Sequence, residues 1–160
     1  MENMDNLTWN AIEDAGYRAS DLSGSNTGVF VGVSTADYKE IMVQNQVTTI
    51  LSQAFISNRV SYVFNLKGPS EPIDTACSSS LVAIHRAIEE IHAGNCDMAI
   101  AGGVNVITCP NLYVTQTKAG MLAEDGRCKT FDKDANGYGR GEGCGILLLK
   151  PLKQAEKDGD

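Results

Sequence analysis

Residues 73–85 read IDTACSSSLVAIH, and the pattern changes in the middle of this stretch. The residues just before Ile73 are extended. Proline offers no amide hydrogen to a neighbouring strand, so Pro72 predicts an edge strand, or a strand whose amide at that position the sheet does not need. From Cys77 to about Ala93 the sequence predicts a helix, which Gly94 closes. We therefore expect a strand that turns sharply into a helix, with a cysteine in the first helical turn.

Three further segments are short and almost wholly apolar, the pattern of strands that are buried on both faces. These predicted strands cover residues 27–33, 97–103 and 145–150. The predicted helices cover residues 7–16, 38–64 and 110–118, a last helix runs from Pro151 to Gly159, and a polar loop covers residues 124–143. Strands that alternate with helices predict an α/β fold whose sheet is covered on both sides.

The composition limits the size of the fold and the kinds of partner. The chain has 160 residues, 42% of them hydrophobic, which is an ordinary globular mix for one domain or part of one. Its formal net charge is −7, so we expect neither a nucleic acid nor an anionic membrane surface as a partner. No run of about 18 apolar residues predicts a membrane span, and residues 1–6 do not read as a signal peptide.

Five cysteines, an odd number, lie far apart in the sequence and form no CxxC pair. This pattern argues against a disulfide framework and a zinc site, and it suits a reducing compartment such as the cytoplasm. Only Cys77 is predicted at the start of a helix. We interpret the other four as core or incidental residues: Cys96, Cys109, Cys128 and Cys144.

Two interpretations of Cys77 stay open at this point. The first amides of a helix have no partners within the helix, and together with the peptide dipoles they favour a negative group there. A thiolate in that place would be reactive, with the small serines at 78–80 leaving room for a substrate and Thr75 capping the helix. The other interpretation is a buried structural cysteine, because free cysteine is often a small core residue.

The two histidines of the chain, His85 and His92, lie on the predicted helix that begins at Cys77. Their positions are roughly 12 and 22 Å along the helix axis from the cysteine, whereas a catalytic hydrogen bond spans about 3 Å. We expect His85 to pair locally on the helix face and His92 to suit the negative end of the helix. If Cys77 is a nucleophile, its basic partners therefore lie outside these 160 residues.

The run DTACSSSL, residues 74–81, resembles the active-site motif of ketosynthase domains from modular type I polyketide synthases, in the thiolase-like superfamily. Further motifs resemble the same family in the family's order: AGGVN at 101–105, KAGML at 118–122, DGRCKTFD at 125–132, GY at 137–138 and RGEG at 140–143. The resemblance implies a thiolase-like layered α-β-α-β-α fold, of which residues 1–160 form only part of the N-terminal half, without the C-terminal half. KGPSEPI at 67–73 is similar to ketosynthases that work with a separate acyltransferase.

The same resemblance implies an acyltransferase of the beta-ketoacyl synthase type. Cys77 would take an acyl chain from the phosphopantetheine of an acyl carrier protein, and a malonyl-type extender would lose CO2 and attack the bound thioester. The backbone N–H of Cys77 would form half of the oxyanion hole. Other synthase domains are implied as partners, together with a homodimer formed through the edge strand before Cys77. No cofactor or metal is implied beyond the phosphopantetheine of the carrier.

Three features of that family are missing from these 160 residues. They are the HGTGT and NIGH histidine motifs, the glycine-rich loop that completes the oxyanion hole, and the first strand, which would precede Met1. We expect that strand to lie at the centre of the sheet, so that two strands lose the neighbour between them. The chain alone would then be marginally stable and would not catalyse condensation.

Two alternative functions stay open. One is a non-elongating ketosynthase, which would only bind or pass acyl chains and which the missing histidine motifs would distinguish. The other is a cysteine-nucleophile hydrolase on an α/β sheet, which shares the strand–turn–helix around Cys77 but does not account for the later motifs.

Two weaker signals lie in or beside the predicted polar loop. Residues 132–137 read DKDANG, like the start of an EF-hand calcium loop. The twelfth position is Gly143 and Glu142 comes one place early, so we do not expect calcium there. Lys118 and Arg140 carry charges that would suit a phosphopantetheine phosphate, but we interpret both as solvated surface residues.

Overall fold

The computed structural model describes residues 4–34, 37–47 and 52–160. They divide into two compact units, which we describe separately. The first unit, residues 1–34, 51–104 and 144–160, contains the sheet and Cys77. The second unit comprises residues 35–50 and 105–143.

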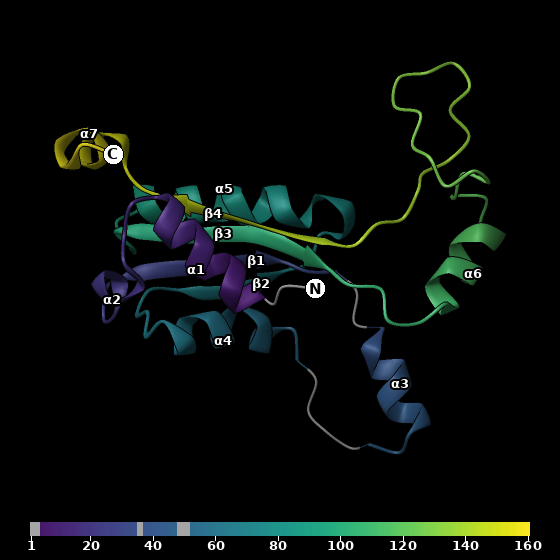
Figure 1. The fold of residues 1–160 in the computed structure, drawn as a ribbon, viewed down its shortest axis with the longest axis horizontal. Coiled ribbons are helices and arrows are strands. Elements are labelled where there is room, and N and C mark those ends of the chain that lie inside the picture. Colours follow the sequence, from purple (N-terminus) through teal and green to yellow (C-terminus); the bar gives the residue numbers. More distant parts are fainter. Residues whose placement is uncertain (1–3, 35–36, 48–51) are drawn as a thin grey trace. The chain divides into compact units, whose positions relative to one another are not determined.

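The sheet has four strands in the order β2-β1-β3-β4, as Figure 1 shows. Their bounds are β1 Thr27–Gly32, β2 Ser70–Ile73, β3 Met98–Asn105 and β4 Gly143–Leu149. β1 is parallel to both of its neighbours, with Val31 opposite Pro72 of β2 and Thr27 opposite Met98 of β3. The strand with Pro72 therefore lies at an edge of this sheet, as predicted.

The prediction that a further strand separates two of these strands is wrong. β1 and β3 are hydrogen-bonded neighbours over six aligned pairs, from Thr27 opposite Met98 to Gly32 opposite Gly103. Each strand that the structure describes is hydrogen-bonded to the next one in the order β2-β1-β3-β4, with no space for a further strand between them. A missing central strand is therefore no reason to expect marginal stability.

Helices cover both faces of the sheet (Figure 1). α5, Ser79–His92, packs on one face, and α1, Met4–Asp14, packs on the other with α4, Ala54–Val63. The first unit also contains α2, Ala19–Leu22, and α7, Leu152–Asp158. The helix predicted over residues 38–64 is two helices, because α3 ends at Gln44 and Gln46 has a left-handed φ of 55°. Residues 48–51 of that prediction lie outside the described residues.

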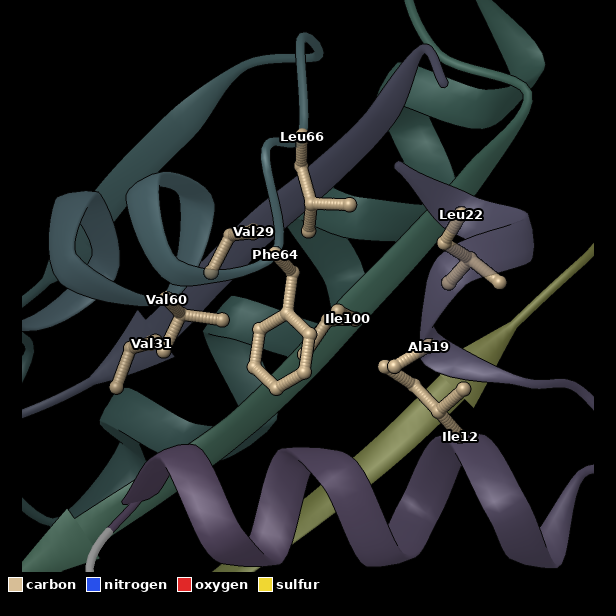
Figure 2. Close-up of a cluster of buried hydrophobic side chains, with 9 residues drawn as sticks. All are labelled: Ile12, Ala19, Leu22, Val29, Val31, Val60, Phe64, Leu66 and Ile100. Carbon is tan, nitrogen blue, oxygen red and sulfur yellow. The ribbon is translucent and has the colours of Figure 1, made fainter. Parts of the chain in front are cut away.

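Alternate side chains of β1 fill two separate cores. Val29 and Val31 face α1 and α4, together with seven other buried side chains drawn in Figure 2: Ile12, Ala19, Leu22, Val60, Phe64, Leu66 and Ile100. Phe30 faces α5 and packs with Ala83 and Ala87. All three β1 side chains are fully buried, and each contributes about 2 kcal/mol by leaving water. This two-sided burial explains why residues 27–33 are apolar without interruption.

β4 differs from this pattern. The predicted strand at 145–150 is confirmed, but the prediction that it is buried is wrong, because its exposure alternates and Leu147 is 48% exposed. β4 lies at the end of the described sheet, where one side has no neighbouring strand. An edge position therefore leaves an apolar run partly open to solvent.

The second unit contains α3, Tyr38–Gln44, and α6, Asn111–Lys118, followed by the predicted polar loop. The carboxylate of Asp37 accepts hydrogen bonds from the backbone N–H (3.0 Å) and the hydroxyl (2.8 Å) of Thr108. Tyr138 of the loop forms an isolated parallel bridge with Leu122, which lies just before the loop. Of the helices that the structure describes in either unit, none has the length and apolar character needed to cross a membrane.

Candidate active site

The chain makes a tight turn between the edge strand β2 and helix α5. β2 ends at Ile73, residues 76–78 form a short 3-10 turn, and α5 begins at Ser79. Ala76 has a φ of 56°, in the left-handed region that residues with a Cβ rarely adopt. The predicted strand–turn–helix is confirmed, with Cys77 in the 3-10 turn just ahead of α5 rather than in its first turn.

Two serine hydroxyls hold this turn together. The Ser79 hydroxyl donates to the carbonyl oxygen of Ala76 at 2.6 Å and accepts from the backbone N–H of Thr75 at 2.9 Å. Ser79 is only 5% exposed. The Ser78 hydroxyl donates to the carbonyl oxygen of Thr75 at 2.8 Å and lies 2.9 Å from the Thr75 hydroxyl. The turn is thus bridged on both sides of Cys77.

The predicted cap by the Thr75 side chain is wrong. Thr75 is the N-cap of the 3-10 turn, but its side chain makes no capping hydrogen bond to an early amide. Its hydroxyl instead faces the hydroxyl of Ser78. Ser78, the N-cap of α5, makes no side-chain cap either, so its hydroxyl serves the turn and not the helix amides.

Glycines allow the start of α5 to lie directly on the ends of two parallel strands. A Cβ added at Gly32, at the end of β1, would come within 2.5 Å of the Ser80 nitrogen. A Cβ added at Gly103 of β3 would come within 2.8 Å of the Ser80 Cβ. The turn with Cys77 is therefore fixed at the carboxyl end of the sheet, the edge at which open α/β sheets bind their ligands.

Asp74 ties the exit of β2 to the turn. Its Oδ1 accepts a hydrogen bond from the backbone N–H of Ala76 at 3.0 Å, as in an Asx turn. This hydrogen bond, followed by those from the side chains of Ser34 and Gln53, lowers the pKa of the Asp74 carboxyl below its ordinary value. Asp74 therefore carries a negative charge at neutral pH.

Cys77 and Cys96 have opposite environments. Cys77 is exposed, so the interpretation as a buried structural cysteine is wrong. Cys96 is 2% exposed, and burial raises the pKa of its thiol. Burial likewise raises the pKa of the Cys144 thiol. Of these three thiols, only that of Cys77 belongs to an exposed residue.

The two histidines lie on α5, as predicted. The Nε2 of His85 is 3.4 Å from a carboxylate oxygen of Glu89, which is the expected local contact on the helix face. His92 is in the last turn of α5. Within the described ranges, no three or more His, Cys, Asp or Glu side chains are grouped so that they could hold a metal ion. Both histidines of α5 thus lie along the helix and away from the turn that carries Cys77.

Lys118 and Arg140, the two charged residues noted in the sequence, lie in the second unit. The guanidinium of Arg140 lies over the ring of Tyr113, 4.7 Å from its centroid, a cation–π contact that the sequence did not predict. Lys118 is exposed in the last turn of α6. In the loop that resembles a calcium site, Asn136 Oδ1 accepts from the Lys129 ammonium at 2.7 Å. Glu142 Oε1 accepts from a backbone N–H at 2.6 Å.

Sequence reasoning missed the residues that shape the turn: Ser79, Gly32 and Gly103. It treated the serines at 78–80 as small residues only, whereas one of them is a buried hydroxyl with two backbone partners. The available signal was a glycine at the carboxyl end of each of two predicted parallel strands. Such glycines indicate a close approach of another backbone.

The model of the beta-ketoacyl synthase N-terminal domain matches residues 4–155 of the chain. The chain belongs to the beta-ketoacyl synthase family. This match covers both units, including Cys77 and the later motifs, and it confirms the resemblance drawn from DTACSSSL. It also disfavours the α/β hydrolase alternative, which offered no account of those motifs.

The relatives of this beta-ketoacyl synthase chain are large synthases. It is 53% identical over 158 residues to polyketide synthase PksN of Bacillus subtilis, covering 95% of the chain but 3% of that protein. It is 46% identical over 159 residues to cyclo-acetoacetyl-L-tryptophan synthase of Aspergillus oryzae, and that match covers 96% of the chain and 4% of the other protein. The chain therefore spans a small part of the curated relatives it matches.

Two solved ketosynthases share the fold of this beta-ketoacyl synthase chain. One is the ketosynthase from module 6 of the bacillaene synthase of Bacillus subtilis, with a TM-score of 0.88 and 44% identity. That match covers 96% of this chain and 27% of the other. The second is an oxazolomycin ketosynthase domain of Streptomyces albus, with a TM-score of 0.87, 43% identity and 98% and 29% covered. The predicted thiolase-like α/β fold is confirmed for its N-terminal part.

Proposed function

We propose that this chain supplies the nucleophile of a polyketide ketosynthase. The observation that carries the proposal is the exposed Cys77, fixed ahead of α5 at the carboxyl end of the sheet, in a chain of the beta-ketoacyl synthase family. α5 begins directly beyond it, so Cys77 lies at the positive end of the helix dipole.

The proposed reaction has two steps. In the first, the Cys77 thiolate attacks the thioester carbonyl of an acyl chain on a carrier protein, and the backbone N–H of Cys77 donates to the oxyanion. The new bond joins the acyl carbon to the Cys77 sulfur, the bond between that carbon and the carrier's sulfur breaks, and the carrier's sulfur leaves as a thiolate that takes up the proton lost when Cys77 ionised. In the second, a malonyl-type extender on a carrier loses CO2, and its enolate attacks the acyl-cysteine carbonyl. The carbon–carbon bond forms and the Cys77 thiolate is released.

A thioester-labelling experiment tests the first step. The full chain is incubated at neutral pH with an acyl-pantetheine thioester, and its mass is measured intact and after digestion. We expect one acyl group, carried by Cys77, and none on the Cys77→Ser variant. Absence of the adduct from Cys77, with the chain folded, would contradict the proposed function.

The same experiment separates the alternatives. A cysteine hydrolase would release many equivalents of free acid per chain, whereas a ketosynthase nucleophile would retain its acyl group. We expect no condensation of acyl and malonyl thioesters by these 160 residues above the level of a Cys77→Ala control. Condensation above that control would contradict the prediction that partners of Cys77 lie elsewhere. The intact domain would distinguish an elongating ketosynthase from one that only passes acyl chains.

We further propose an acyl carrier protein and neighbouring synthase domains as partners, and a homodimer formed along the outer edge of β2. Support for the dimer comes from the sheet order, in which β2 pairs with β1 on one side only. The five free cysteines suit the reducing cytoplasm. Sedimentation of the intact domain tests the dimer, and a monomer at all concentrations would exclude it.

A further inference from the structure

We propose that Ser79 is a positioning residue for Cys77. The proposal extends the proposed function, in which Cys77 is the nucleophile. Ser79 does not touch the substrate in this proposal. Its hydroxyl holds the turn in the one conformation that presents the sulfur ahead of the helix amides.

The first support is the pair of hydrogen bonds made by a single buried hydroxyl. It donates to the carbonyl oxygen of Ala76 and accepts from the backbone N–H of Thr75. These two groups come directly before Cys77, so the hydroxyl closes the turn across the cysteine. Ser79 as a residue is 5% exposed, so water does not readily replace its hydroxyl if the hydroxyl is removed.

The second support is the strain that the hydroxyl opposes. Ala76 is held at a φ of 56°, where a residue with a Cβ is disfavoured. Such strained residues persist only where the surroundings over-determine them. Here the hydroxyl fixes the Ala76–Cys77 peptide through the carbonyl of Ala76 and the Asp74–Thr75 peptide through the amide of Thr75, so it holds the chain before and after the strained conformation.

The third support is the rigid base under Ser79. Its neighbour Ser80 lies against the ends of β1 and β3, at positions where a Cβ on Gly32 or Gly103 would clash. The start of α5 therefore does not move freely on the sheet. Because the Ser79 hydroxyl bonds to Thr75 and Ala76, the turn is held in place relative to the start of α5, and so is Cys77.

Alkylation of the full chain by iodoacetamide, followed site by site with mass spectrometry, tests the proposal. We expect Ser79→Ala to slow alkylation of Cys77 about 10-fold, because a thiol displaced by a fraction of an ångström loses its alignment with the helix amides. The matched control is Ser80→Ala, which removes an exposed hydroxyl and keeps the Cβ that packs on the strands. We expect the control to stay within about twofold of the wild-type rate.

Cys96 reports on unfolding in the same experiment, because it is buried beneath α5. Protection of Cys96 in Ser79→Ala, together with slow alkylation of Cys77, supports a positioning role. A wild-type alkylation rate at Cys77 with Cys96 still protected overturns it.

A second pair of variants covers the case in which Ser79→Ala exposes Cys96. The threonine of Ser79→Thr keeps the hydroxyl, whereas the valine of Ser79→Val has nearly the same shape as threonine but a methyl group in place of that hydroxyl. A difference between these two variants therefore reports on the hydrogen bonds to Thr75 and Ala76. We expect Cys77 to react faster in the threonine variant, and equal rates overturn the proposal. Failure of the wild-type chain to accept an acyl group, with this alkylation pattern intact, would instead overturn the proposed function alone.

Discussion

The two ends of α5 use glycine in different ways. At the end next to Cys77, Gly32 lacks a Cβ that would clash with the helix, whereas at the end next to Cys96, Gly94 adopts a left-handed φ. Gly32 has an ordinary φ, but a Cβ there would collide with the backbone of Ser80. Gly94 has open space around it and a φ of 76°, which ends the helix. The first end is thus fixed by packing, and the second by local backbone geometry.

The thiols at the two ends follow the same division. Cys77 is exposed in a turn that two serine hydroxyls hold, whereas Cys96 is sealed between the sheet and α5. A reactive group needs both access and a fixed position, and only the end with crowded glycines provides both. Packing against the strands, and not the helix alone, therefore fixes the turn that carries Cys77.

The largest expected effect is at Gly32. Gly32→Ala should destabilise the fold by about 3 kcal/mol, since backbone atoms of α5 must move to admit the methyl group. Urea unfolding measures this loss, and we also expect slower alkylation of Cys77. Gly145→Ala is the matched control, because a Cβ there meets open space at an ordinary φ. Equal stability of the two variants would show that the close packing of Gly32 against α5 does not stabilise the fold.

The next effect contrasts the two cysteines under one substitution. Cys96→Ser should cost about 1.5 kcal/mol, because a hydroxyl replaces a thiol in an apolar core. Cys77→Ser should change the free energy of unfolding by less than about 0.5 kcal/mol, since its side chain is exposed. Thermal unfolding of both variants checks this difference. A larger cost at Cys77 would show that its thiol is part of the packing.

A smaller effect is expected at the other end of the helix. Gly94→Ala should cost about 1 kcal/mol, the penalty for a Cβ at a left-handed φ where nothing crowds it. The alkylation rate of Cys77 should stay at the wild-type value. Slower alkylation of Cys77 in this variant would mean that the two ends of α5 are coupled.

The smallest effect concerns Asp74 and pH. The N–H of Ala76 lowers the pKa of the carboxyl in the folded state, so the stabilisation is present above the unfolded value of about 3.9. It is lost as the pH falls through the lower, folded pKa. Wild type should therefore be more stable than Asp74→Asn at neutral pH, and the two should converge in strong acid. A difference in unfolding free energy between wild type and Asp74→Asn that stays constant from neutral pH to strong acid would contradict the lowered pKa of Asp74 in the folded state.

The sequence alone predicted the turn and most elements well, because these rest on local patterns. The apolar run of β1, the proline of β2 and the glycine that ends α5 each act over a few residues. The exposure of Cys77 was one of two open interpretations, since a cysteine at the start of a helix occurs in both settings. Family membership rested on motifs spread along the whole chain, and the match to residues 4–155 confirms it.

What the sequence could not predict depends on long-range placement. β4 is as apolar as β1, so nothing local indicates that it lies at the end of the described sheet with Leu147 half exposed. The order of strands is likewise not written in any segment, and the order expected from the resemblance was wrong. The role of the Ser79 hydroxyl needs the carbonyl of Ala76 to point at it, which only the folded turn provides.

The pairing of β1 with β3 also bears on how the chain is synthesised. β1 is buried on both faces and lies between two strands, yet Met98, the partner of Thr27, follows it by about seventy residues. At about 5–20 residues per second, a ribosome would need roughly 4 to 14 seconds to make that stretch. During that interval the most fully buried strand of the sheet would be without its second neighbour. That interval is when a chaperone would matter most for this chain.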